Sequence, residues 1–235
     1  MGTSTSYNAP PNWSGNKSTL TRHRGQSLGQ RSVADFVRNH IDSNGGTKSI
    51  TSGGGILGSG ATAKKTATNL GGLFSDILRY GFDGALQRND DLKHLIGKPI
   101  NEVFQAIREL WDVPGNSMDA VDSRAALIDL FEEIEKEAEF EDIDKILRQK
   151  TTPVILFRYF GFYIYEQIRR VHFEDEIKNQ LGDNSERHFN EIKDFIHFKI
   201  KSIAFDQDIT NINWFGREGK VIVNRIINSV LEVFQ

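Results

Sequence analysis

From about residue 63 to the end of the chain, apolar residues recur every three or four positions, which is the spacing of one face of an α-helix. Five stretches show this pattern, and the alternation typical of a β-strand is nowhere sustained. The stripes are Leu70, Leu73, Phe74, Ile77 and Leu78; Val103, Phe104, Ile107 and Leu110; Leu127, Leu130, Phe131 and Ile134; Phe189, Ile192, Ile196, Ile200 and Ile203; and Val221, Ile222, Ile226, Val230 and Phe234. The pattern predicts an all-α, bundle-like body.

Residues that stop and start helices agree with these stripes. Gly81 is a typical C-terminal residue, and Pro99 fits a first helical turn. Thr152 and Pro153 form an N-cap and first-turn pair before the most apolar run of the chain, residues 154–165. That run is too short to span a bilayer and contains Arg158, so we expect a buried core helix.

The first 68 residues differ from the rest in charge and composition. They contain eight lysines and arginines but two aspartates, a net charge of +6, in a chain whose total is −3. Glycine crowds residues 45–60, and such a segment buries too little apolar surface to offset its chain entropy. We therefore predict a flexible Gly/Ser/Thr-rich basic segment over residues 1–62, ordered only against a partner, and a helical domain over residues 63–235.

One part of the basic segment has a helical pattern of its own. Val33, Phe36, Val37 and Ile41 share one face of residues 32–41. We expect a short docking helix there, and no independent structure in residues 1–31 and 43–62.

Several patterns associated with catalysis fail on their context. Residues 53–58 read G-x-G-x-x-G, but no strand precedes them, as dinucleotide binding requires. Residues 47–49 and 64–66 resemble the end of a phosphate-binding loop without its paired glycines. The chain has no cysteine, which excludes disulfides and thiolate zinc sites and fits a reducing cytoplasm. No secretory signal is apparent, so we expect a cytoplasmic protein.

The histidines do not cluster in the sequence. His188 and Glu191 are one helical turn apart, which could place two metal ligands on one face. A dinuclear site in a bundle needs that pairing repeated on a second helix, and no repeat is present. We expect His188 at the surface or at the boundary of the core, the acidic run 132–139 to be a solvated face, and neither a metal site nor a cofactor. With no acid–base pair either, we expect a protein that is not an enzyme.

The N-terminus offers a different kind of site. Removal of Met1 leaves Gly2 with an α-amine whose pKa is about 8, so part of it is nucleophilic at neutral pH. The residues that follow it are small and polar up to the first aromatic residue: Thr3, Ser4, Thr5, Ser6 and Tyr7. The opening also fits the myristoylation pattern, although one acyl chain anchors weakly and we expect no membrane association. An ordinary frayed end is the alternative interpretation.

Two parts of the chain resemble a known family. The opening Met1–Tyr7 and the stretches Leu95–Ile107, Pro114–Ala120 and Ser123–Ala125 are similar to the QatB family of bacterial Qat anti-phage systems. The family pattern reads L-x-G-x-P-x-x-E-V, then P-G-G-T-x-D-E-A and R-x-A. Asn116 and Ser117 stand where Gly and Thr are usual.

The resemblance implies a subunit without a catalytic motif of its own. Its expected partners are an ATPase (QatA), a QueC-like enzyme (QatC) and a TatD-like nuclease (QatD). QueC-type enzymes adenylylate the carboxylate of a 7-deazaguanine and attack it with an amine. The resemblance therefore suggests Gly2 as the acceptor of a 7-deazaguanine conjugate, with residues 3–7 bound by QatC.

The basic segment leaves a second function open. Its charge suits non-specific phosphate contacts, and Tyr7 or Trp13 could stack on a base. The same charge also suits docking onto an acidic partner or onto the acidic helices of the chain itself.

Overall fold

A computed structural model describes residues 13–24, 26–46, 60–112, 117–138, 143–178, 184–205, 209 and 211–235. Within these residues every regular element is a helix, which confirms the predicted all-α class. The α-helices are α1 (Trp13–Arg22), α2 (Gly29–Ser43), α4 (Ala61–Tyr80), α5 (Phe82–Arg88), α6 (Ile100–Trp111), α7 (Met118–Ala138), α8 (Ile143–Gln149), α9 (Thr152–Lys178), α10 (Asn184–Ile200) and α11 (Arg217–Glu232), with a 3₁₀ turn, η1, at Lys93–Leu95.

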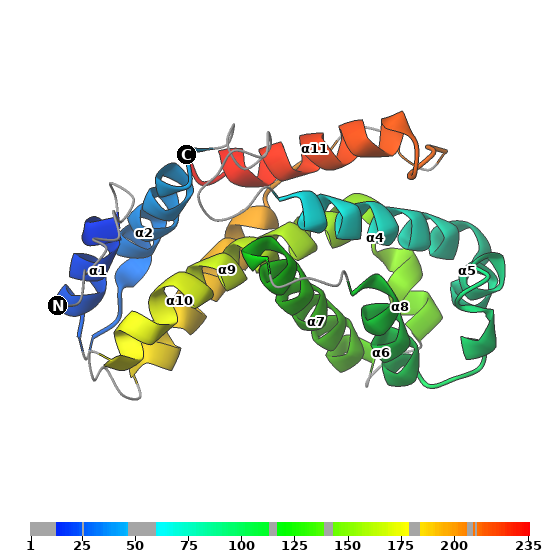
Figure 1. Ribbon diagram of the computed structural model, residues 1–235, viewed down its shortest axis with the longest axis horizontal. Coiled ribbons are helices and arrows are strands. Elements are labelled where there is room, and N and C mark those ends of the chain that lie inside the picture. Colours follow the sequence, from blue (N-terminus) through cyan, green and yellow to red (C-terminus); the bar gives the residue numbers. More distant parts are fainter. Residues whose placement is uncertain are drawn as a thin grey trace, which may run out of the picture.

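The long helix α9 forms the centre of the fold, and α4, α7, α10 and α11 pack around it (Figure 1). A helix that is apolar on every side must be buried, and the predicted core helix is buried in this way. Its fully buried side chains include Ile155, Leu156, Tyr159, Phe160, Tyr163 and Ile168. Arg158, the charged residue inside this run, reaches Glu137 on α7, with 3.0 Å between Nη1 and Oε1.

Most of the predicted stripe residues lie in the core, Leu78 and Ile203 are half-buried, and two residues are exposed. Leu110 near the end of α6 is 44% exposed, and Val221 in the second turn of α11 is 56% exposed. Both lie near a helix end, where no neighbouring helix covers the outer edge of the stripe. Periodicity predicts the face of a helix correctly but does not say how far along that face the neighbouring helix extends.

The N-terminal part of the chain forms a helical hairpin, α1–α2, at one end of the molecule (Figure 1). Helix α2 includes the predicted helix at residues 32–41 and packs against α1 and α10. Helix α1 is not predicted by the hydrophobic pattern, because among residues 14–22, whose burial the structure describes, only Leu20 and the polar Asn16 are buried. The proposed division of the chain at residue 62 stays a prediction.

Three helices begin at backbone N–H groups that a distant carboxylate accepts. Glu191 of α10 accepts from Leu28 N at 2.7 Å, just before α2. Asp119 of α7 accepts from Thr62 N at 2.8 Å in the first turn of α4. Asp144 of α8 accepts from Phe82 N at 2.7 Å, where α5 begins. The N-cap residues of these three helices make no side-chain cap hydrogen bond, and among the described residues the one local contact at these starts is from Gly29 N to Ser27 Oγ at 3.3 Å. Their first turns therefore depend largely on tertiary contacts.

The segment before α11 crosses α4 at two consecutive glycines. The Trp214 ring lies so close to Gly71 that a Cβ there would overlap it, and the ring N–H donates to Ser75 Oγ at 2.7 Å. Trp214 is buried, whereas the next residue, Phe215, is 71% exposed and lies over Gly72. The close approach therefore fixes the position of an exposed aromatic ring.

No helix among the described residues is long and apolar enough to cross a membrane.

Candidate functional site

The residues that the sequence singles out as a site, Gly2 and residues 3–7, lie outside the described part of the chain. The first described residue is Trp13, which begins α1. The structure therefore describes the support from which this N-terminal peptide starts, namely the α1–α2 hairpin and the helix that holds it. We call the residues before Trp13 the N-terminal peptide.

The hairpin is attached to the body by an apolar face on α2. Val33, Phe36, Val37 and Ile41 are all buried there, as their spacing predicts. They are the residues through which α2 can pack on the α10 side of the body. At about 25 cal/mol per Å² of apolar surface, burying side chains of this size contributes roughly 1.5–3 kcal/mol each. The hairpin is thus attached by a conventional hydrophobic seam.

His188 and Glu191 hold the connection between α1 and α2. The ring Nε2 of His188 lies 2.8 Å from the carbonyl oxygen of Gln26, so this nitrogen is the donor. One turn later, Glu191 accepts the N–H of Leu28. We call these two contacts the backbone clasp. They bind one acceptor and one donor, two residues apart in the chain.

The clasp corrects one prediction and explains another. His188 is fully buried and not at the surface, because the α1–α2 connection covers it. The one-turn spacing from Glu191 does place both side chains on one face, where they bind protein backbone. Among the described residues no group of three or more potential metal ligands is found.

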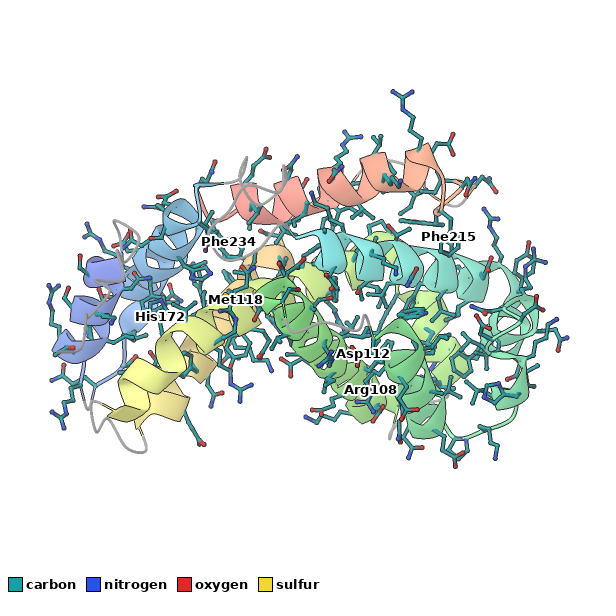
Figure 2. The ribbon with its side chains drawn as sticks, in the orientation of Figure 1. Arg108, Asp112, Met118, His172, Phe215 and Phe234 are labelled. Atoms are coloured by element: carbon teal, nitrogen blue, oxygen red, sulfur yellow. The ribbon has the colours of Figure 1, made fainter. Side chains whose placement is uncertain are left out.

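A buried polar cluster lies behind α2. The ring centroids of His40 and His172 are 6.3 Å apart (Figure 2 labels His172), and Phe36 contacts the His172 ring at 5.0 Å. Asn44 Nδ2 donates to the His40 carbonyl at 2.9 Å, and Asn16 Nδ2 donates to the Phe36 carbonyl at 3.2 Å. A buried polar group costs free energy unless it is hydrogen-bonded, and a buried charge costs much more.

The pKa of His40 is lowered from 6.5 to about 3, mainly by burial and then by the neighbouring His172 and Arg170. The ring is therefore neutral near pH 7. A proton on His40 would place a charge inside the seam between α2 and the body, so the attachment of the hairpin depends on His40 staying neutral.

A second polar network lies where α4 begins. Besides Thr62 N, Asp119 accepts the hydroxyl of Tyr163 at 2.8 Å. Ser123 contacts Tyr159 and Thr66 through hydroxyl pairs at 2.7 and 3.0 Å. These groups come from α4, α7 and α9, so the network joins the three helices at one point.

Asp122 and Arg170 continue the network toward the surface. Arg170 Nε and Nη2 donate to the two carboxylate oxygens of Asp122 at 2.7 and 2.8 Å. Burial raises the pKa of Asp122, and the two hydrogen bonds from Arg170 oppose that rise. Burial also raises the pKa of Tyr159 and Tyr163, with a contribution from Asp119. Both phenols therefore stay protonated and act as hydrogen-bond donors.

The space beside this network is too small for a substrate. Its cavity, lined by Thr62, Thr66 and Ser123 among others, measures about 10 Å³, far below the few hundred Å³ of a typical ligand pocket. The carboxylates of Asp119 and Asp122 are both bound by protein donors. We interpret the network as the support that fixes the start of α4.

The same residues carry the resemblance noted in the sequence. Asp119 and Ser123 belong to the stretches 114–120 and 123–125, and Ser117 Oγ accepts the N–H of Ala120 in the first turn of α7 at 3.1 Å. Arg124 Nε donates to Asp112 Oδ1 at 2.8 Å, joining α7 to the end of α6 (Figure 2). Each of these side chains has a structural partner.

Comparison with protein families identifies the family of this chain. The family described as "Qat anti-phage system associated protein QatB" matches residues 58–234, more than half of the chain. The chain belongs to the QatB family. It is thus a component of a Qat anti-phage system. No curated protein and no solved structure matches it.

The matched range divides the molecule in an informative way. It contains the start of α4, the Asp119 network and the α10 side of the backbone clasp. The α1–α2 hairpin and Gly2 precede it. The body is therefore the part that the QatB match covers, and the role of the N-terminal peptide stays a prediction.

Proposed function

We propose that this member of the QatB family is a non-catalytic helical adaptor whose N-terminal peptide is modified by a QueC-like partner, QatC. Gly2, exposed as the first residue after removal of Met1, is the acceptor, and Thr3, Ser4, Thr5, Ser6 and Tyr7 are the residues that the partner binds. QatA and QatD are further partners in the same system. The observation that supports the proposal is that the N-terminal peptide leads directly into an anchored hairpin, whose first helix begins at Trp13.

Anchoring at Trp13 gives the peptide a fixed base and a limited reach. Residues 2–12 can extend at most about 35–40 Å from α1, at 3.3–3.6 Å per residue. Small side chains suit a narrow channel, and glycine allows close approach of its backbone to another active site. A partner that holds the body can therefore receive the α-amine without any rearrangement of the helices.

The proposed reaction forms one amide bond. The partner uses ATP to join AMP to the carboxylate of a 7-deazaguanine, releasing pyrophosphate. The nitrogen of Gly2 attacks that carbonyl carbon, the C–N bond forms, AMP leaves and the amine loses a proton. This chain supplies only the nucleophile, and the catalytic groups belong to QatC.

Co-expression with QatC followed by intact-mass and N-terminal peptide mass spectrometry tests the proposal. The expected result is an adduct on Gly2 of the wild-type chain. Gly2→Glu retains Met1 and should carry none. Asn8→Ala keeps the terminal glycine, lies beyond the residues that the partner binds, and should still be modified. An unmodified Gly2 in the presence of active QatC would sink the proposal.

Nucleic-acid binding is the second candidate, and one observation favours it. Arg22, Arg24, Arg31 and Arg38 are all exposed on the hairpin. Charge reversal of Arg22, Arg31 and Arg38 should abolish salt-dependent retention on DNA if this face binds phosphate. Retention that survives these substitutions would contradict it.

A further inference from the structure

The exposed ring of Phe215 lies between two hollows of opposite charge. One hollow, of about 380 Å³, lies between the N-terminal half of α4 and α11, and Lys64, Lys65 and Lys220 line it. The other, of about 550 Å³, lies between the second half of α4, α5 and the end of α6. Figure 2 places Phe215 beside α4, near the start of α11.

The second hollow is acidic. Asp76, Asp90 and Asp91 line it together with one cation, Arg88, and Lys93 beside the hollow forms an ion pair with Asp90. With Lys93 counted, its net charge is −1, against +3 in the first hollow. Arg88 in turn lies over the ring of Tyr80, with 4.3 Å between Cζ and the centroid. Along α4 the surface therefore changes from the basic hollow, through the ring of Phe215, to the acidic hollow.

This order is self-complementary under a two-fold rotation about Phe215. A second copy turned by 180° places its acidic hollow opposite the basic one, and the reverse, while the two Phe215 rings meet at the axis. Isologous interfaces pair a surface with itself in this way. A nucleic acid fits less well, because phosphates that bind the lysines would meet the three aspartates at the other end.

The local structure supports an anchor at the centre. Exposed aromatic rings held in place are the residues that dominate interfaces. Phe215 is held because Trp214 is buried against Gly71, and Gly219 leaves no space for a Cβ beside the backbone of Trp214. Leu110, 44% exposed in the acidic hollow, adds apolar surface next to it.

We propose that the α4–α11 face, with Phe215 at its centre and lysines and aspartates on either side, forms a two-fold homodimer of this chain. The lysines of each copy contact the aspartates of the other. This inference is independent of the proposed modification of Gly2 and goes beyond it.

Sedimentation velocity on the full-length chain is the test. Over about 1–100 µM, a range in which an interface of micromolar affinity titrates, the mass should rise from 26.6 kDa toward twice that value. Phe215→Asp should abolish the dimer. Phe198→Asp on α10 is the matched control, because Phe198 is also 71% exposed, and it should leave the dimer intact.

Charge exchange tests the two-fold arrangement itself. Lys65→Glu with Lys220→Glu, or Asp90→Lys with Asp91→Lys, should each weaken the homodimer at least about tenfold by placing like charges opposite one another. Mixing the two double variants should restore a dimer, because the introduced glutamates of one variant then face the introduced lysines of the other. Lys17→Glu with Lys136→Glu changes the net charge equally on other helices and should have no effect. All variants are first checked by circular dichroism.

Three results would overturn the inference. The first is a monomer at all concentrations. The second is a dimer that ignores Phe215→Asp and both charge variants, which would place the interface elsewhere or assign this face to another segment or partner. The third is a mixture of the charge variants that fails to dimerise, or a series of higher oligomers, which would exclude a closed two-fold pair.

Discussion

The start of α2 and the start of α4 are held by the same device with different strength. In both, a carboxylate from a distant helix accepts the first backbone N–H groups. Asp119, at α4, is buried and also binds Tyr163, whereas Glu191, at α2, is half-buried and also contacts the exposed Arg187 at 3.3 Å. The body is thus fixed by a closed network, and the hairpin by a clasp that borders solvent.

Packing differs in the same direction. Beside the Asp119 network the cavity measures about 10 Å³, while between α2 and α10 an open groove measures about 730 Å³ and reaches the exposed ring of Phe198. A region with fewer buried contacts and an exposed polar clasp opens at lower free energy than a closed core. We therefore expect the hairpin to open at a lower free energy than the body.

Breaking the body network should have the largest effect. Asp119→Ala removes the acceptor for Thr62 N and Tyr163, so we expect a loss of about 3 kcal/mol in the free energy of unfolding. Urea denaturation followed by circular dichroism measures it. Asp35→Ala, on the exposed face of α2, should change stability by less than about 0.5 kcal/mol. Equal effects of the two variants would contradict the central role of Asp119.

The two adjacent glycines of α4 sharpen the contrast between closed and open packing. Gly71→Ala inserts a methyl group into the buried ring of Trp214, and we expect a destabilisation of about 2–3 kcal/mol. A Cβ at Gly72 lies 3.2 Å from the exposed edge of the Phe215 ring, and a tilt of a few tenths of an ångström, with the backbone of Phe215 still in place, relieves this contact. Alanine also favours the helix. Gly72→Ala should therefore be neutral or slightly stabilising, and urea denaturation measures both variants. Similar losses in both variants would contradict this reading of the crossing.

Acid should loosen the hairpin before the body. The pKa of His40 is about 3 in the folded protein and 6.5 in an exposed ring. The lowered pKa contributes stability that is present above pH 6.5 and is lost as the pH falls toward 3. Between pH 6.5 and pH 5 the loss is about 2 kcal/mol, at about 1.4 kcal/mol per pH unit.

Hydrogen exchange at both pH values, corrected for intrinsic rates, measures this loss. Residues 29–43 should exchange faster at pH 5 relative to α7, and His40→Gln should remove that difference. Equal acid sensitivity of α2 and α7, or no change in His40→Gln, would be the contrary outcome.

Opening the clasp should have the smallest effect. Glu191→Ala leaves the N–H of Leu28 without its acceptor, which costs about 1 kcal/mol for a partly exposed group. Faster hydrogen exchange should appear in α2 and leave α4 unchanged. Glu186→Ala, an exposed site on the same helix, is the control. A global change in exchange would mean that the hairpin and the body unfold together.

Much of the fold could be predicted from the sequence because helical periodicity is local. The stripes that contain Phe104 on α6 and Phe131 on α7 face each other, with 4.1 Å between the two ring centroids. The apolar run 154–165 forms the buried centre of the fold. The carboxylates that cap the first turns of α2, α4 and α5 could not be predicted in the same way. They belong to residues more than fifty positions away, and no local pattern contains that information.

The candidate site, too, could be predicted from the sequence only where its pattern is local. The one-turn spacing of His188 and Glu191 is visible in the sequence, but their ligand is backbone from residues 26–28, which only the folded chain brings near. The pair Gly71 and Gly72 is a weak sequence signal that another segment crosses α4 closely. It does not say that the segment is Trp214–Phe215, far along the chain. Gly2 and the residues after it rest on chemistry and family resemblance.

The backbone clasp also has an evolutionary consequence. His188 and Glu191 recognise a carbonyl and an N–H, which almost any residue at positions 26 and 28 supplies. Substitutions at the exposed Gln26, or insertions before Trp13, can therefore accumulate without altering how the hairpin is anchored. Selection can adjust the N-terminal peptide to a changing partner while the genes that encode such chains preserve the same helical body.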